Sequence, residues 1–177
     1  SQEKGEQLSI ANVRQVNQKK QLKNPNVVIS IDDLGEESLL EKYCISRTGT
    51  RTADNPQFLI NYWEIFDRTT IWDYQQTSPH SVIDYSGRVF LIRWEQGNGN
   101  LKKYHQLGLA SIQGQAAWNR LGVCIRLIGD LPATIYTGQI FDMNTSVVWP
   151  KALSDLPAIF SYCSSPEYAI NIRKLHQ

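Results

Sequence analysis

Apolar positions along the chain recur with two different periods. Short apolar runs typical of strands lie at 88–94, 123–128, 134–141 and 146–149. Apolar residues spaced three and four apart predict a helix over 55–63, behind Asp54 as its cap and with Pro56 in its first turn. Two more helices are predicted at 154–163 and 165–175. The pattern predicts an α+β fold with a mostly antiparallel twisted sheet, flanking helices and a C-terminal helical pair.

The N-terminal part of the chain differs from the rest. Residues 7–22 are rich in Gln, Asn and Lys, carry a few apolar residues at loosely helical spacing, and end at Asn24-Pro25-Asn26. We expect residues 1–26 to form a polar arm or linker, with plain disorder as the alternative. A short strand over 27–31 and a helix over 36–42 then open the domain expected over 27–177. Since the chain begins with serine and has a single methionine, Met143, we expect it to be a fragment of a longer protein.

A glycine-rich turn suggests one hairpin. Gly97-Asn98-Gly99 separates the apolar run at 88–94 from 101–104, which predicts two paired strands. A dinucleotide phosphate loop would instead need a helix directly after these glycines. On a strand, Lys102 and Lys103 would point to opposite faces, so only one of them could face a ligand.

Charge and cysteine content exclude little by themselves. The 18 basic and 17 acidic residues leave a net charge of +1, which is compatible with a nucleic-acid binder whose basic residues gather on one face. Cys44, Cys124 and Cys163 are widely spaced, and the three histidines are isolated, so we expect buried thiols, no disulfide framework and no metal site. No apolar run approaches the roughly 18 residues that span a bilayer, so we expect a cytoplasmic protein without a membrane partner.

One local string invites a catalytic interpretation. Asn55-Pro56-Gln57-Phe58 is similar to the N/D-P-P-Y/F loop with which adenine methyltransferases hold a flipped base. The second proline is missing, and no F-x-G-x-G loop for the methyl donor precedes it. We therefore expect no catalytic residue in this chain, no methylation of DNA and no binding of S-adenosylmethionine.

Three stretches together resemble the target-recognition region of large single-chain DNA adenine methyltransferases from restriction-modification and phage-exclusion systems. Residues 47–58 are similar to that family's G-x-x-T-G-D-N-x-R-F segment, with Ala53 and Gln57 departing from it. Trp63-Glu64-Ile65 and 89–94 resemble its tryptophan-bearing strands, although residues 75–80 replace the expected K-G-G element. Residues 136–151 and 156–168 resemble its C-terminal part. The second of these ranges is similar to the family's motif L-P-A-hydrophobic-x-x-F-C-S-S-P-E-F. The motif residues are Gly49, Thr52, Asp54, Asn55, Phe58, Gly138, Phe141, Asp142, Cys163, Ser164, Ser165 and Pro166.

This resemblance implies a domain that binds double-stranded DNA and positions it for a methyltransferase domain of the same parent polypeptide. The cofactor S-adenosylmethionine would bind in that other domain, which is not in this chain. Arginine, asparagine and glutamine suit base edges and lysine suits phosphates. The candidates for DNA contact are Arg47, Arg51, Asn98, Lys102, Lys103, Asn119, Arg120 and Arg126.

Other interpretations stay open. Each candidate could simply be a solvated surface group, and the domain could be a protein–protein interaction or scaffold module without DNA contact. We expect Trp63, Trp94, Trp118 and Trp149 to pack in the core, with stacking on exposed bases as the alternative. The recognised DNA sequence, any nuclease activity of the parent protein and the oligomeric state do not follow from these residues.

Overall fold

A computed structural model describes residues 15–24, 30, 39–67 and 69–175 of the 177-residue chain. The chain divides into two compact units. The main unit is Leu40–Ala169, and the terminal unit is Ser1–Leu39 together with Ile170–Gln177. The boundary predicted between residues 26 and 27 falls within residues 25–29, outside the described residues, so it stays a prediction.

The first sheet of the main unit is entirely antiparallel and has the strand order β1-β8-β5-β6. Its strands are β1 (Cys44–Thr48), β5 (Gly122–Arg126), β6 (Ala133–Tyr136) and β8 (Thr145–Pro150). Alternate residues of β8 face opposite sides, as strand geometry requires. Val148 therefore packs with Ile159 and Cys163 in one core, while Val147 packs with Tyr136 in a second core.

The second sheet has the order β2-β4-β3-β7, and its only parallel pair among the described strands is β3 with β7. Its strands are β2 (Leu59–Asn61), β3 (Trp72–Gln76), β4 (Phe90–Arg93) and β7 (Ile140–Phe141). A third core forms where Phe58, Ile92 and Leu101 pack together. Phe141 of β7 joins the second core, so the two sheets share that cluster.

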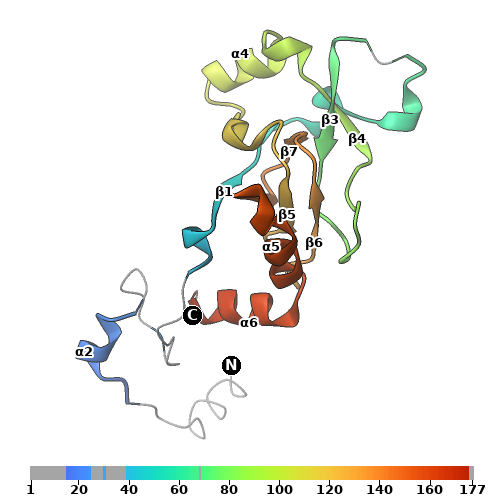
Figure 1. Cartoon of the computed structure of the whole chain (residues 1–177). Helices are drawn as coiled ribbons and strands as arrows, with labels where there is room; N and C mark the ends of the chain where they lie inside the picture. The colour runs from blue at the N-terminus through green and yellow to red at the C-terminus, as the bar shows by residue number, and fades with distance from the viewer. Residues whose placement is uncertain (1–14, 25–29, 31–38, 68, 176–177) are drawn as a thin grey trace, which may run out of the picture. The chain divides into compact units, whose positions relative to one another are not determined.

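Helices cover the first sheet on the side away from the second core. Helix α5 (Leu156–Cys163) contacts β5, β6 and β8, and Figure 1 shows it in front of β5 and β6. The 3-10 helix η6 (Leu153–Asp155) precedes it, and α6 (Pro166–Leu175) follows after a short break. The C-terminal helical pair and the α+β class are confirmed, although the strands form two sheets instead of one.

Helix α2 (Gln18–Gln21) lies in the terminal unit, and Asn17 caps it by accepting the Lys19 N–H at 3.0 Å. The carboxamide oxygen of Gln21 accepts the Ser30 N–H at 2.7 Å, and the Ser30 hydroxyl lies 3.5 Å from the Lys174 carbonyl. Residues 1–14 and 25–26 of the expected arm lie outside the described residues, and so do residues 27–29 and 31 of the expected strand.

Several predicted elements are wrong in type or length. Residues 101–104 are not a strand, because α4 (Asn100–Gln106) follows the turn at 97–99. The helix expected over 55–63 ends early: α3 (Asn55–Phe58) passes into β2, and then the 3-10 helix η3 (Tyr62–Glu64) follows. The strand expected over 134–141 is divided by Thr137-Gly138-Gln139 into β6 and β7. Of the helix expected over 36–42, the described part is the 3-10 helix η2 (Leu40–Lys42).

The three cysteines are free and buried, as expected. Across the described ranges, no helix combines the length and apolar character needed to cross a bilayer.

Candidate nucleic-acid-binding groove

A groove of about 780 Å³ lies where the chain leaves β1 and meets the turn after β7. The Thr50 N–H donates to the Phe141 carbonyl at 2.7 Å, and the Met143 N–H donates to the Thr50 carbonyl at 3.1 Å. Gly49 makes this approach possible, because a Cβ there would lie 2.2 Å from the Phe141 carbonyl oxygen. Two segments far apart in the sequence thereby form one wall.

The loop after Thr50 supplies the polar rim of the groove. The Thr52 hydroxyl donates to the side-chain oxygen of Asn55 at 2.5 Å, which holds that amide in place. Asp54 caps α3 by accepting the Gln57 N–H at 3.2 Å, and Phe58 is fully buried beneath. Cap, proline and buried aromatic residue together explain why a helix begins here. Asn55 is the first residue of this helix, so the same features hold it in place where it lines the groove.

Asp142 brings a carboxylate into the groove. Burial raises its pKa above the usual carboxyl range, and the backbone N–H groups of Asn144 and Ser78 partly oppose that shift. The Asn144 N–H donates to Oδ1 of Asp142 at 2.7 Å. The side chain is therefore oriented by the backbone, and Arg51 lines the same groove.

Arg51 is the basic residue of the groove among the predicted DNA contacts. Its backbone pairs with Ser111 through two hydrogen bonds of 2.8 and 2.9 Å. Its side chain is exposed, and Nη2 lies 3.4 Å from the Leu109 carbonyl. The backbone thus holds Arg51 independently of what its guanidinium contacts.

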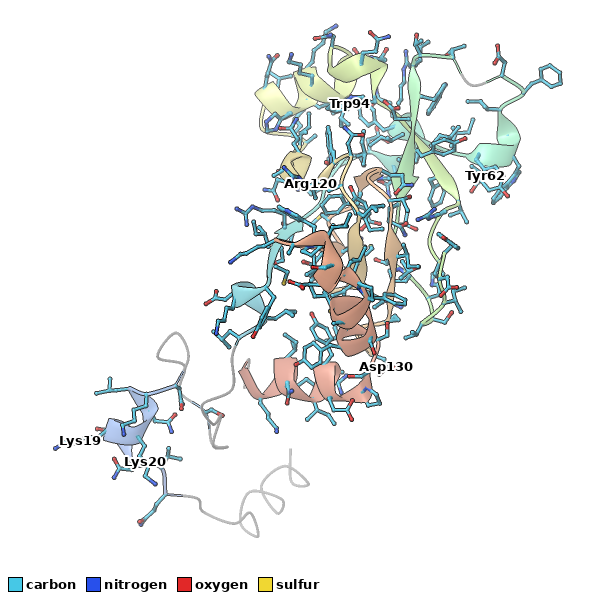
Figure 2. The ribbon with its side chains drawn as sticks, in the orientation of Figure 1. Lys19, Lys20, Tyr62, Trp94, Arg120 and Asp130 are labelled. Atoms are coloured by element: carbon cyan, nitrogen blue, oxygen red, sulfur yellow. The ribbon has the colours of Figure 1, made fainter. Side chains whose placement is uncertain are left out.

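The remaining DNA-contact candidates are dispersed. Asn119 lines a second cavity of about 400 Å³ with Gly138. The other six line neither cavity: Arg47, Asn98, Lys102, Lys103, Arg120 and Arg126. Arg47, Asn98, Lys102, Lys103 and Arg120 are exposed, whereas Arg126 is half-buried. Figure 2 shows Arg120 and Tyr62 well apart from each other.

The second cavity contains aromatic rings and polar atoms. Trp94 and Trp118 meet edge to face with centroids 5.1 Å apart. The Trp118 indole N–H and the Gln139 carboxamide oxygen are buried without a partner among the described residues. Gly138 has φ +102 and lies against the Asn119 backbone, where a Cβ would be 2.8 Å from the Asn119 Cα.

The tryptophans divide between core and surface. Trp149 is buried in the second core, and Trp94 and Trp118 are partly buried, as expected. Trp63 is 61% exposed, so the expectation that it packs in the core was wrong. It stacks edge to face on exposed Tyr62, in a loop that continues to the fully exposed Phe66.

The C-terminal motif has structural contacts instead of a place at the groove. Cys163 is 2% exposed and packs in the first core. The Ser164 N–H donates to the Phe160 carbonyl at 3.0 Å, and the Ser165 hydroxyl donates to the Tyr162 carbonyl at 2.8 Å. Pro166 then begins α6. This string forms the connection between the two C-terminal helices.

No family model matches the chain, and no curated protein matches it. The interpretation of the groove therefore depends on its geometry and on the motif residues that line it. Thr52, Asn55 and Asp142, from two separate stretches of the resemblance, line the groove.

A phosphate does not fit at the turn before α4, although a helix does follow the glycines there. Oε2 of Glu95 accepts the Asn100 N–H at 3.0 Å, so a carboxylate occupies the place that an anion would need. A Cβ on Gly99 would lie 1.7 Å from the same oxygen. Within the described part of the chain, no three His, Cys, Asp or Glu side chains gather as a metal site.

Sequence reasoning missed several groove residues. Gln75, Thr77, Ser78 and His80 all line it, and all four lie in residues 75–80, where the chain departs from the resemblance described above. The signal was a polar run, Gln75 to His80, placed between two aromatic strands.

Proposed function

We propose that this chain is a DNA-binding target-recognition domain of a restriction-modification N-6 adenine methyltransferase, which positions duplex DNA for a catalytic domain outside this sequence. One observation carries the proposal. Thr52 and Asn55 from one resembling stretch and Asp142 from another line a single groove, beside exposed Arg51. Under this proposal S-adenosylmethionine belongs to the catalytic domain, and the protein acts in the bacterial cytoplasm.

The groove has the chemical groups that contact with DNA requires. Arg51 can neutralise a phosphate, and the Asn55 amide and Asn144 can donate to and accept from base edges. A module that holds DNA for another domain needs positioning groups on a rigid frame more than it needs a large positive charge. The backbone bonds of Thr50 and Arg51 supply that frame.

Salt-dependent binding of a fluorescent duplex tests the proposal. Replacing Arg51 by alanine keeps its backbone bonds, so we expect unchanged folding. We expect weaker binding to all sequences and a salt slope smaller by about one unit, since each neutralised phosphate contributes about that much. Lys151→Ala is the matched control, because Lys151 lies at the other end of β1, where its Nζ donates to the Glu41 carbonyl. Equal effects of the two variants, or affinity independent of salt, would contradict the proposal.

A protein-interaction module is the second candidate, and the exposed loop Tyr62–Phe66 favours it. Tyr62, Trp63 and Phe66 are 53%, 61% and 108% exposed, which is unusual for large aromatic residues. Glu64 and Asp67 beside them are exposed and acidic, which disfavours DNA phosphate at this loop. If Trp63→Ser abolishes self-association or partner binding while Arg51→Ala leaves DNA binding unchanged, this second function is the correct one.

A further inference from the structure

The turn before α4 contains an asparagine followed by a glycine, and neither residue lines the groove. Asn98 is exposed, and its side-chain oxygen accepts from Nζ of Lys102 at 3.4 Å. The Gly99 N–H makes no hydrogen bond to any residue that the structure describes. The turn therefore places an electrophilic amide carbon next to a main-chain nitrogen that no hydrogen bond holds.

Asn100, two residues later, provides an internal comparison. Nζ of Lys103 donates to its side-chain oxygen at 3.5 Å, so a lysine lies equally near. The nitrogen that follows Asn100 belongs to Leu101, which lies within α4 and has a fully buried side chain. Helical backbone and a bulky packed side chain both oppose the movement of that nitrogen toward the amide. The two asparagines thus differ in the following nitrogen and not in the nearby cation.

We infer that Asn98 deamidates in the folded protein: the Gly99 nitrogen attacks its side-chain carbon, and Lys102 stabilises the negative charge that develops on the side-chain oxygen. A fixed positive group near a developing oxyanion lowers the barrier to such an attack. The ψ angle of Asn98 is 2° and must rotate for the attack, and glycine has no Cβ that opposes this rotation. The inference is independent of the proposed function.

The reaction is a substitution followed by hydrolysis. A bond forms between the Gly99 nitrogen and Cγ of Asn98, which closes a cyclic imide. The bond from Cγ to Nδ2 breaks, and ammonia leaves with the proton that the Gly99 nitrogen gives up. Water then opens the imide, at one carbonyl to give aspartate and at the other to give isoaspartate. The net change is one water consumed and one ammonia released, with no oxidation or reduction.

Conversion changes the start of α4. Oε2 of Glu95 accepts the Asn100 N–H, and Gly99 packs so closely that a Cβ there would lie 1.7 Å from the same oxygen. Isoaspartate lengthens the main chain by one carbon directly before Gly99, so Gly99 and Asn100 cannot both keep their places at this carboxylate. We therefore expect the isoaspartate form to lose the side-chain cap of α4.

Mass spectrometry of protein aged at mildly alkaline pH tests the inference. Cleavage after Arg93 and Lys102 gives a peptide that contains both asparagines, so fragment ions assign the mass gain, and an unaged sample is the blank. We expect conversion at Asn98 and none at Asn100. We also expect a native rate within about tenfold of the rate in urea, because a reaction that required global unfolding would be slower by on the order of a thousandfold or more. A native rate suppressed that far, or equal conversion of the two asparagines, would overturn the inference.

Lys102→Met and Lys103→Met are matched variants, since each removes an exposed cation that lies near an asparagine. We expect Lys102→Met to slow the conversion of Asn98 by about threefold, which is the size of effect that an exposed charge contact gives. Lys103→Met should leave the rate at Asn98 unchanged. Equal rates in the two variants would overturn the inferred role of Lys102.

Asn98→Gln tests the effect on α4, because glutamine keeps the carboxamide and cyclises far more slowly. We expect aged wild-type protein to lose about 3 °C of Tm, the shift that loss of one helix cap gives in a chain of this size. The aged Asn98→Gln variant should keep its initial Tm. Wild-type protein converted to isoaspartate with an unchanged Tm, or an equal fall in both proteins, would overturn the inferred loss of the cap.

Discussion

Asp142 is a carboxylate that the fold holds away from water beside the groove. Its charged form is penalised by burial, and backbone N–H groups offset only part of that cost. The raised pKa has a consequence for stability. A carboxyl whose folded-state pKa lies above its unfolded value stabilises the fold fully at low pH. That stability is lost as pH rises through the folded-state pKa.

We therefore expect Asp142→Asn to raise the stability of the protein at neutral pH. The asparagine oxygen can still accept the Asn144 N–H, and no charge is buried. The gain should disappear below the ordinary carboxyl range, where Asp142 is protonated in both states. Urea denaturation midpoints at the two pH values measure this.

Asp54→Asn is the control for that experiment, since asparagine caps a helix about as well as aspartate. Asp54 is exposed and caps α3, so its replacement should change neither midpoint. A gain from Asp142→Asn that is equal at both pH values would show that removal of charge is not its cause.

At the scale of elements, α4 shows how a side chain outside a helix determines where that helix begins. Residues 95–97 all have positive φ, at 52°, 54° and 76°, and this turn brings the Glu95 carboxylate back to the start of the helix. Oε1 of Glu95 also accepts from Nη2 of Arg93 at 3.1 Å. Lys102 and Lys103 consequently lie on an exposed helix, about 100° apart around its axis. The premise that only one of them can face a ligand was wrong.

Glu95→Ala should destabilise the protein by about 1 kcal/mol, the usual cost of removing a side-chain cap. The Asn100 N–H then has no acceptor, and the favourable carboxylate near the helix N-terminus disappears. Thermal or urea unfolding measures the change. Glu41→Ala is the matched control, because the bond that Glu41 makes with Lys151 uses its backbone carbonyl. A destabilisation no larger than in this control would show that the carboxylate does not stabilise α4.

At the scale of the whole molecule, the three cysteines are probes for the opening of the two cores that flank the first sheet. Cys44 and Cys163 lie in the first core, and Cys124 lies in the second. Burial raises the pKa of Cys44 to about 11 and those of Cys124 and Cys163 to about 12. Thiolate, the reactive form, is therefore scarce at neutral and mildly alkaline pH.

We expect a disulfide reagent to modify none of the three cysteines in the native protein at mildly alkaline pH. Under denaturing conditions all three should react. If the main unit unfolds cooperatively, they should become reactive together across a urea gradient, at the midpoint seen by fluorescence. Early reaction of Cys124 alone would instead show that the second core opens separately.

The sequence by itself determined the elements whose signals are local. Ser165, Pro166 and Glu167 form a start signal that places α6 correctly, and the apolar runs of β4, β5 and β8 place those strands to within a few residues. A cap, a proline or an unbroken apolar run acts through neighbouring residues, so pattern alone suffices.

Only the tertiary structure decided the division into two sheets, the helix at 100–106 and the groove. Leu101 is fully buried against Phe58 and Ile92, and the Glu95 carboxylate caps its helix, so a helical turn forms where the local pattern favours a strand. Gln75 and Asp142 meet because β3 pairs with β7, which comes much later in the chain. Pairing between distant strands depends on shared burial and backbone hydrogen bonds, and no single stretch of sequence contains both partners.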